Sequence, residues 1–244
     1  MAQNTHSLDL ENSSSQYASI TDAAQTGLDL SGNATIEAWV KFETTPPSAG
    51  DGMSIVTKYS GASDHGYIFR LANVSGTLRL LWLISANGSS DTNGQVDWPA
   101  SAGVWYHIAA VYTAAGGTVD FYVDTVQQGA QQSGLSTSIF NNTADFLVGQ
   151  QESTFFLDGK IDEVRVWSTT KTSADLLANW KKHLTGSETN LQGYWRFNND
   201  YLDQTANNND LTASGSPVFS TDVPFTIPEG GSPMFFSSGG VTIG

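Results

Sequence analysis

The chain of 244 residues contains no cysteine, and basic side chains are scarce. The absence of cysteine excludes disulfide bonds, thiol nucleophiles and cysteine-bound zinc. Ten Lys and Arg residues stand against 24 Asp and Glu residues, which gives a formal net charge of −14. Because so few cations can neutralise only a few phosphate groups, we expect no nucleic-acid partner.

Long apolar runs are also missing from the sequence. No stretch approaches the roughly 18 apolar residues of a membrane-spanning helix, so membrane insertion is not expected. Residues 1–6 carry neither the basic segment nor the apolar segment of a signal peptide. The four histidines, at positions 6, 65, 107 and 183, are too widely spaced along the chain to indicate a metal-ligand cluster.

Aromatic residues and glycine take the place of the missing charge. Charged residues make up only 14% of the chain, whereas an ordinary soluble domain has roughly 25%. Aromatic residues reach 11%, with seven Trp, and there are 24 Gly. This aromatic content can fill a large core, and a chain of this length can form a single all-β domain.

Short strand patterns dominate the chain. In residues 35–42 (TIEAWVKF), every second side chain from Ile36 to Phe42 is apolar. Similar runs occupy residues 54–58, 65–71, 77–85, 105–112, 118–123, 144–148 and 159–167. Gly, Asn, Ser or Asp residues bound each run. Many short strands at this spacing predict two packed antiparallel sheets.

One short helix is predicted beside the strands. Residues 172–182 begin with a Thr–Ser cap and end in a basic turn, which is typical of a helix. Leu176, Leu177 and Trp180 fall on one face of it, so we expect this face to lie against an edge of the sandwich.

The C-terminal segment reads as an extended arm. Proline and glycine interrupt the chain beyond about residue 222, so we expect one domain over residues 1–222 and an arm over residues 223–244. The arm either folds back on its own domain or docks on a neighbouring subunit. Its candidate contact residues are Phe225, Met234, Phe235 and Phe236.

Three motifs occur in a fixed order along the chain. They comprise residues 7–10 (SLDL), 17–20 (YASI) and 35–40 (TIEAWV), then 105–112 (WYHIAAVY) and 119–124 (VDFYVD), then 147–149 (LVG) and 157–167 (LDGKIDEVRVW). Together they resemble the laminin-G-like, pentraxin-related jelly roll of the concanavalin A-like lectin and glucanase superfamily. The resemblance covers roughly residues 7–215 and implies an all-β jelly-roll sandwich of two antiparallel sheets. It does not identify a function, because one fold carries many different sites.

A fourth motif, residues 193–198 (GYWRFN) and 202–211 (LDQTANNNDL), resembles the family's aromatic strand and the loop after it. In relatives, such loops often hold calcium. Calcium takes six to eight oxygen ligands. The candidate ligands in this loop are Asp203, Asn208, Asn209 and Asp210. The alternative is that these residues form tight turns through local backbone hydrogen bonds.

The resemblance to pentraxins implies a second candidate calcium position, after residues 147–149. Residues 150–153 (QQES) form a shortened loop there with a single acid, Glu152. Ca²⁺ is therefore the candidate cofactor, and Glu152 is its candidate ligand at this second position.

Catalytic carboxylate pairs are not visible in the sequence. Asp162 and Glu163 are neighbours in one strand, so we expect them to point to opposite faces of the sheet. Asp120 and Asp124 share a face, but they lie about 13 Å apart at roughly 3.3 Å per residue. The glucanases of the superfamily carry an E-x-D-x-x-E strand, which has no counterpart here. We therefore predict a protein without catalytic activity.

Sugar binding needs an aromatic face with polar neighbours. Trp98 ends a polar segment that also holds Asp91, Asn93 and Asp97, and these four residues are the main glycan-binding candidates. Trp82, in the apolar run of residues 78–84, is a further candidate. The alternative for Trp98 is a packing role at the edge of the sandwich.

These observations favour a non-catalytic recognition module that binds a glycan or a surface polysaccharide, with calcium as a candidate cofactor. The alternative is a structural decoration or appendage subunit of a virion or another surface assembly. In that case the N-terminus and the C-terminal arm would contact other copies of the chain or a capsid subunit. Either function implies an extracellular location or one on a virion or cell surface.

Overall fold

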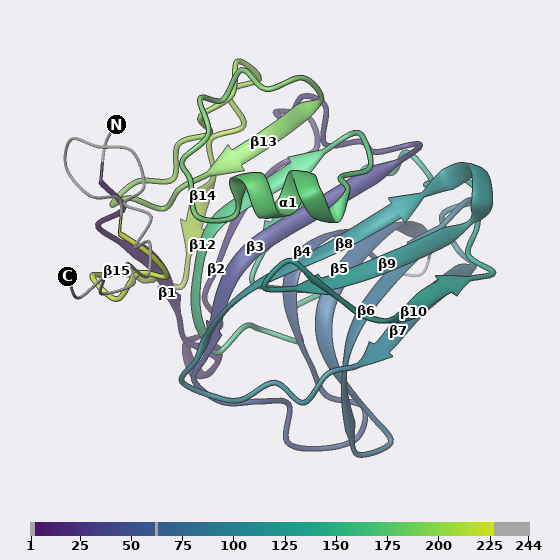
Figure 1. Ribbon diagram of the computed structural model, residues 1–244, viewed down its shortest axis with the longest axis horizontal. Helices are drawn as coiled ribbons and strands as arrows, with labels where there is room; N and C mark the ends of the chain where they lie inside the picture. The colour runs from purple at the N-terminus through teal and green to yellow at the C-terminus, as the bar shows by residue number, and fades with distance from the viewer. Residues whose placement is uncertain (1–2, 62, 227–244) are drawn as a thin grey trace, which may run out of the picture.

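Two antiparallel β-sheets pack face to face in the computed structural model, which describes residues 3–61 and 63–226 (Figure 1). The eight-stranded sheet has the order β10 (Val126–Ser133), β9 (Thr118–Val123), β8 (Trp105–Thr113), β3 (Ala34–Phe42), β12 (Gly159–Trp167), β1 (Ser7–Leu10) and β15 (Val218–Ser220), with β13 (Leu191–Trp195) paired to β12. The seven-stranded sheet has the order β14 (Thr212–Ser214), β2 (Tyr17–Ile20), β11 (Phe146–Val148), β4 (Gly52–Ser60), β5 (Asp64–Val74), β6 (Thr77–Ser85) and β7 (Asp91–Asp97). The prediction of an all-β jelly-roll sandwich is confirmed.

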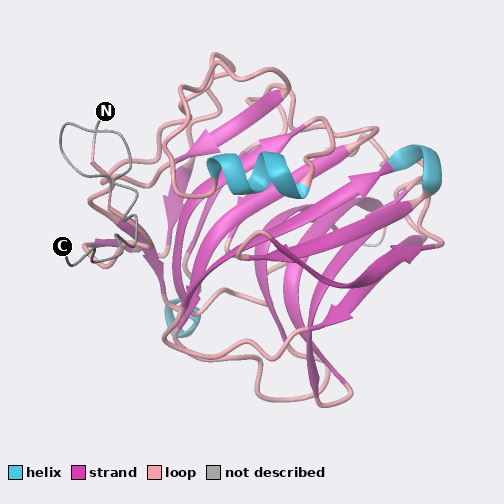
Figure 2. Cartoon of the chain, in the orientation of Figure 1, coloured by secondary structure: helices cyan, strands magenta, loops and turns pink. Residues whose placement is uncertain are grey.

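The core lies between the two sheets. The alternating apolar side chains of β3 point into it, as the pattern predicts, and they are fully buried: Ile36, Ala38, Val40 and Phe42. Facing strands of the other sheet contribute large side chains such as Phe69, Trp82 and Phe146. Figure 2 shows how little of the chain is helical: α1 (Ser173–Asn179) and the short 3₁₀ turns η1 (Asn12–Ser14) and η2 (Ala114–Gly116).

Helix α1 lies across the outer face of the eight-stranded sheet (Figure 1). A reciprocal pair of bonds between Thr172 and Asp175 caps its start, as the sequence indicates. Leu176 is buried against β8 and β9, whereas Leu177 is 59% exposed, so the expectation that both share the packed face is wrong. The helix ends at Asn179, whose carbonyl has no partner within the helix and accepts from Arg165 Nη1 of β12 at 3.2 Å.

Strand β12 contains a bulge that changes which way its acids point. Glu163 has a φ of +52°, and the pairing register with β3 shifts between Asp162 and Arg165. Ile161 and Val164 both enter the core, so the two residues between them both lie on the outer side. The expectation that Asp162 and Glu163 point to opposite faces is therefore wrong.

The beginning of the predicted arm lies on its own domain. Asp222 accepts bonds from Lys41 Nζ at 2.6 Å and from Trp105 Nε1 at 2.9 Å. Phe225 is 9% exposed, and its ring centroid lies 5.9 Å from that of Trp39. The other predicted contact residues, Met234, Phe235 and Phe236, fall outside the described residues.

The ends of the described chain also pair with each other. Strand β15 runs antiparallel to β1, with Ser7 opposite Ser220, and Ser7 Oγ donates to Asp222 O at 2.8 Å. Within residues 3–61 and 63–226, no helix is both long and apolar enough to cross a bilayer.

Candidate functional site

Trp82 cannot contact a sugar. Its side chain is completely buried in the core, where its ring lies parallel to that of Tyr67 at 5.9 Å and near that of Tyr112 at 6.3 Å. Arg79 is the one polar residue in the run of residues 78–84, and the alternation of β6 places Trp82 inward with Leu80 and Ile84. The prediction of Trp82 as a glycan-binding residue is thus corrected.

Trp98 serves as packing at the edge of the sandwich. It is 6% exposed, and its ring meets that of Tyr106 edge-on at 5.0 Å and that of Phe42 at 6.2 Å. The small exposed part of Trp98 borders a surface hollow of about 460 Å³. No ring face is left for stacking, so the packing alternative describes Trp98.

Of the polar candidates on β7, only Asp97 lines the same hollow as Trp98. Asp91 and Asp97 stand about 20 Å apart along the strand at roughly 3.3 Å per residue. Asp97 pairs with Arg79 at 2.8 Å, and Asn93 is exposed between the two acids. Asp91 instead contacts His65 Nδ1 at 2.8 Å and accepts from the Tyr59 hydroxyl at 3.1 Å. Asp91 therefore belongs to a different part of the sheet.

Asp203 organises its loop and has no capacity left for calcium. Its carboxylate accepts four hydrogen bonds, from the backbone nitrogens of Tyr194, Thr205 and Asn209 at 2.9–3.0 Å and from the Thr205 hydroxyl at 2.7 Å. Four donors fill the lone pairs of a carboxylate. The prediction of Asp203 as a calcium ligand is therefore wrong.

The other members of this loop are tied in the same way. The Asn209 side chain is fully buried; it accepts from Thr26 N at 2.7 Å and donates to the carbonyls of Thr26 and Gln192. Asp210 accepts from Asp203 N, and Asn208 donates to Ala206 O. The turn alternative describes Asp203 and Asn209, whereas Asn208 and Asp210 are exposed and remain predicted ligands without these two partners.

A separate acidic cluster forms where β1 meets the end of β3. The carboxylates of Asp9, Glu11 and Glu43 lie within 4.8 Å of one another, the one such group of three among the residues described. Burial, then Glu43 and Asp9, raise the pKa of Glu11. Lys160 Nζ pairs with Asp9 at 3.1 Å and with Glu43, so a cation of the protein itself offsets one of the three negative charges.

Glu152 leads to a site that the sequence motifs do not mark. It lies at the tip of a tight turn after β11, in which Gln151 and Thr154 exchange backbone hydrogen bonds. Glu152 and Ser153 have φ angles of +49° and +58°, the pair of positive values that a type I′ turn requires. Asn-Gly is the usual sequence for such a turn, so its backbone is strained here.

The turn folds onto the outer face of the seven-stranded sheet. Thr57 Oγ1 donates to Gln150 O at 2.8 Å, and Ser54 N donates to Phe155 O at 2.9 Å. Arg70 donates to Gln151 Oε1 at 2.9 Å and lies 4.6 Å above the Phe155 ring. These contacts reach the segments on both sides of the turn, the legs of the turn, and fix its position over β4 and β5.

Between this turn and the sheet is an open hollow of about 340 Å³. We call it the turn hollow. Its main lining side chains are two tyrosines, three acids and an amide: Tyr17, Tyr59, Asp64, Asp145, Gln150 and Glu152. They come from β2, β4, β5, the segment before β11 and the turn, and only Glu152 was a candidate on sequence grounds. The hollow therefore combines aromatic surface with hydrogen-bonding groups.

Polar neighbours fix Tyr59 in the turn hollow. Its ring stacks on that of His65 at 3.9 Å, and its hydroxyl donates to Asp91. Burial and the Asp91 charge raise the pKa of Tyr59, so it remains a neutral hydroxyl. Because His65 Nε2 donates to Gly61 O at 2.7 Å, the stacked pair is held from both ends.

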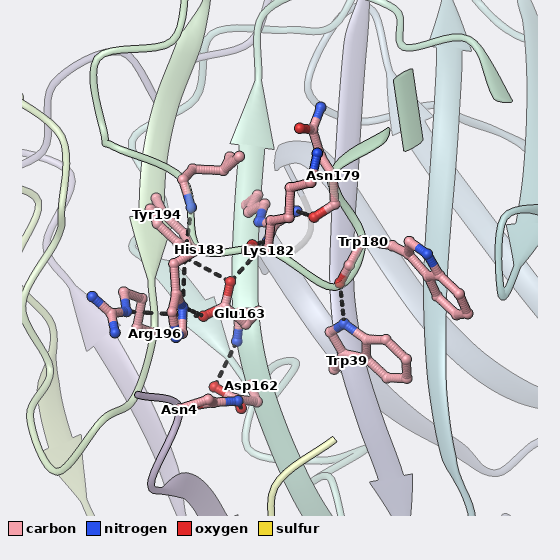
Figure 3. A network of polar contacts seen from close by, with 12 residues as sticks. Asn4, Trp39, Asp162, Glu163, Asn179, Trp180, Lys182, His183, Tyr194 and Arg196 are labelled. Atoms are coloured by element: carbon pink, nitrogen blue, oxygen red, sulfur yellow. Dashed lines mark hydrogen bonds and ion pairs between the residues drawn. The ribbon is translucent and has the colours of Figure 1, made fainter. Parts of the chain in front are cut away.

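A second group of functional residue types lies buried under α1 (Figure 3). Glu163 contacts His183 Nδ1 at 2.7 Å and accepts from the Tyr194 hydroxyl at 2.6 Å and from Arg165 at 2.8 Å. Glu37 contacts His107 Nε2 and accepts from the Trp167 indole, both at 2.9 Å. Acid–histidine pairs of this kind resemble catalytic groups, so their accessibility decides their role.

Burial assigns this network a structural role. Glu37, Glu163 and Arg165 are each at most 2% exposed, so a substrate cannot reach them. Burial alone would raise the pKa of Glu37, but the Arg165 charge and the bond from His107 lower it to about 2. Burial and the adjacent Glu163 raise the pKa of Asp162, which Asn4 covers at 2.8 Å. Ion pairs within a fold perturb pKa values as active sites do.

A laminin-G family model described as the concanavalin A-like lectin/glucanases superfamily matches residues 12–176. The chain belongs to this superfamily. The resemblance seen in the sequence motifs is thereby confirmed, and the match includes the turn hollow and most of both sheets. No curated protein sequence matches this concanavalin A-like chain.

Solved structures share the concanavalin A-like fold at low sequence identity. A Bacteroides ovatus protein described as carbohydrate binding has 20% identity and a TM-score of 0.68, covering 92% of this chain and 61% of its own. A heptameric SAP-like pentraxin from Limulus polyphemus has 14% identity and a TM-score of 0.51, covering 84% and 94%. The binding domain of Paraclostridial Mosquitocidal Protein 1 has 12% identity and a TM-score of 0.51, covering 64% and 39%. At these identities, the structural similarities establish only that the fold is shared. This chain spans about 61% of the length of the B. ovatus chain.

Proposed function

We propose that this concanavalin A-like domain is a non-catalytic module that binds carbohydrate in the turn hollow. The observation that carries the proposal is the pairing of two tyrosine rings with polar groups that the fold leaves free. The side chains of Gln150 and Glu152 form no hydrogen bond with any residue that the structure describes. The B. ovatus protein described as carbohydrate binding supports this function.

The chemistry of the turn hollow suits a sugar ring. One face of a pyranose is apolar and stacks on an aromatic ring, while its hydroxyls donate and accept hydrogen bonds. Tyr17 and Tyr59 provide aromatic surface, and each also has a polar tip. A few fixed polar groups in a partly apolar hollow are the usual composition of a small-molecule site.

The acids of the turn hollow act as hydrogen-bond acceptors in this proposal. Asp64 accepts from the Thr143 backbone at 2.9 Å and from its hydroxyl at 3.0 Å, which holds Asp64 as a positioning group. Asp145 accepts from Asp22 N at 3.1 Å through one oxygen, and the residue is exposed. Neither arrangement gives Asp64 or Asp145 the role of a general acid that protonates a glycosidic oxygen. We therefore propose that the site binds the sugar without hydrolysing it.

Calcium is not needed for this mode of binding. The one group of three acids that meet within 4.8 Å in the described chain is Asp9, Glu11 and Glu43, away from the turn hollow. We therefore propose that hydroxyls of the ligand bond directly to Gln150 and Glu152. The module would act outside the cell or on a cell or virion surface, where polysaccharides are exposed.

Binding to soluble polysaccharides tests the proposal. We expect Tyr17→Ala to weaken binding to dextran, mannan or galactan by about tenfold or more, roughly 1.4 kcal/mol, because the sugar loses its stacking surface. The titration is run in EDTA and again in calcium, and reducing ends are assayed in parallel. Leu177→Ala, an exposed change on α1 above the other sheet, is the control.

Three results would count against the proposal. If Tyr17→Ala and the parent protein bind the polysaccharide with equal affinity, the sugar does not bind in the turn hollow. Loss of binding in EDTA would show that calcium is required. Release of reducing ends would make the protein an enzyme.

A further inference from the structure

We infer that the ligand of the turn hollow is an uncharged polysaccharide, and that sulfated, uronic or sialylated chains are rejected. The inference rests on the proposed function and adds the chemical class of the carbohydrate. It comes from the balance of charges around the hollow.

The charged side chains that line the turn hollow are all acidic. Asp64, Asp145 and Glu152 line it, and Asp91 stands behind Tyr59 at 3.1 Å from the hydroxyl. Glu152 is exposed at the tip of the turn, directly beside the opening. An anionic sugar would therefore meet like charges from several sides.

The nearest lysine is not available to a ligand. Lys58 is 1% exposed, and its ammonium lies 2.7 Å from Asp22 and 2.8 Å from Asp29. It also donates to the carbonyl and to the side chain of Asn142. Two carboxylates therefore outweigh its single charge, and all its donors are in use.

The nearest arginine, Arg70, is close enough for its charge to act on Tyr59, but its guanidinium is engaged by the turn. Arg70 donates to Gln151 Oε1 and lies against the Phe155 ring, and it is not among the residues that line the turn hollow. Its guanidinium serves to hold the turn. No basic residue lines the hollow, so an anionic group would be desolvated there without a partner.

A second, mostly apolar hollow borders the turn. It has about 380 Å³, its one acid is Asp51, and its apolar lining comes from the other leg of the turn, from β4 and from the segment before β4: Phe155, Phe156, Met53, Pro46 and Pro47. Again no basic residue lines it. The Tyr17 and Phe156 ring centroids lie 6.4 Å apart and connect the two hollows. A chain of sugars can therefore cross the turn over two hollows without basic lining residues, and the nearest cation, Arg70, is held against the Phe155 ring.

The charge of the whole molecule acts in the same direction. At −14, it repels anionic polymers at distances up to the Debye length, about 8 Å at physiological salt. Like charges across an interface suppress the wrong partner more than they strengthen the right one. Selection against anionic glycans is thus expected to weaken at high salt.

Matched polymers that differ only in charge test the inference. Dextran is compared with dextran sulfate, and highly methyl-esterified pectin with its de-esterified form, in EDTA at 0.15 M and 0.5 M NaCl. We expect each charged form to bind at least tenfold more weakly than its neutral counterpart at 0.15 M NaCl. This difference in affinity should be smaller at 0.5 M NaCl. Glu152→Gln should also reduce this difference in affinity between the neutral and charged forms. Asp97→Asn removes the same charge from β7 and should leave the difference unchanged.

The possible results separate the inference from the proposed function. Equal or tighter binding of a charged form in EDTA overturns the inference and leaves carbohydrate binding intact. Binding of a charged form only when calcium is added also overturns it, because a bridging cation would then set the specificity. No binding of any neutral or charged polymer overturns the proposed function itself.

Discussion

Charged side chains that the fold removes from water compensate one another on the outer face of the eight-stranded sheet. Arg165 stands between Glu163, at 2.8 Å, and Glu37, at 3.7 Å. Removing one member of such a group leaves a buried charge without its partner, which costs several kcal/mol. Several groups of the network also keep unpaired atoms, such as His107 Nδ1 and Arg165 Nε, so it is only partly satisfied.

Glu37 should make the stability of the protein depend on acid. Its pKa falls from 4.5 to about 2 on folding, so its charge stabilises the fold above pH 4.5, and this contribution is lost as the pH falls through 2. The shift corresponds to about 3 kcal/mol. We expect the difference in unfolding free energy between the parent and Glu37→Gln to shrink by about this amount between pH 6 and pH 2, measured by urea denaturation.

Asp97→Asn provides the comparison for this measurement, because Asp97 forms an exposed pair with Arg79. Exposed ion pairs contribute little to the free energy of unfolding. The effect of Asp97→Asn on this free energy should therefore vary by less than about 1 kcal/mol between pH 6 and pH 2. A Glu37→Gln effect that does not vary with pH would contradict the assigned role of Glu37.

At the scale of elements, the strained turn after β11 is the least regular part of the seven-stranded sheet. Three residues without glycine's freedom take positive φ angles within it: Glu152, Ser153 and Phe155. The contacts of Arg70 and Thr57 with the legs offset this strain. The element that borders the proposed site is therefore held by its anchors, since its own backbone preferences oppose its shape.

Ser153→Gly should relieve part of this strain. Glycine adopts a φ near +58° without the steric cost of a Cβ atom, so we expect stability to rise by about 0.5–1 kcal/mol. Thermal melting measures the effect, and carbohydrate affinity should stay within twofold because Gln150 and Glu152 are retained. A lower melting temperature would show that the serine hydroxyl has a structural role.

Sequence patterns predict regular strands well and their irregularities poorly. The alternation in β3 correctly places Ile36 and Phe42 in the core, because period two is a direct property of an extended chain. The bulge at Glu163 adds one residue to β12, and a simple alternation pattern contains no signal for it. The same limit applies to the turn at Glu152, which lacks the Asn-Gly sequence that marks such turns.

On the scale of the whole molecule, the turn hollow joins segments that are distant in sequence. Tyr17, Tyr59, Asp145 and Glu152 meet because β2, β11 and β4 are neighbours in the sheet, although they are far apart in the chain. Sequence motifs are local, so they located Glu152 through a family resemblance and missed its partners. Conversely, Trp98 stood among polar residues in the sequence, but tertiary packing against Tyr106 buried its ring.

Truncation of the C-terminal arm separates its two predicted roles. The contacts described for the arm are made by Phe225, next to the anchor of Asp222 on Lys41 and Trp105. A chain that ends after Thr226 should keep its melting temperature, whereas one that ends after Thr221 should lose several degrees. Light scattering on both variants and the parent tests assembly: a smaller particle after truncation at Thr226 would support the subunit alternative.

The pairing of β1 with β15 has a consequence for how the protein folds. These strands are neighbours in space, although more than 200 residues separate Ser7 from its partner Ser220. Closing so long a loop is slow, and folding rates fall as contacting residues become more distant in sequence. During synthesis, the edge of β1 that pairs with β15 stays unpaired until β15 has been translated. An unpaired strand edge can pair with another chain and so promote aggregation. Completion of the eight-stranded sheet is therefore a late event, which follows translation of nearly the whole domain.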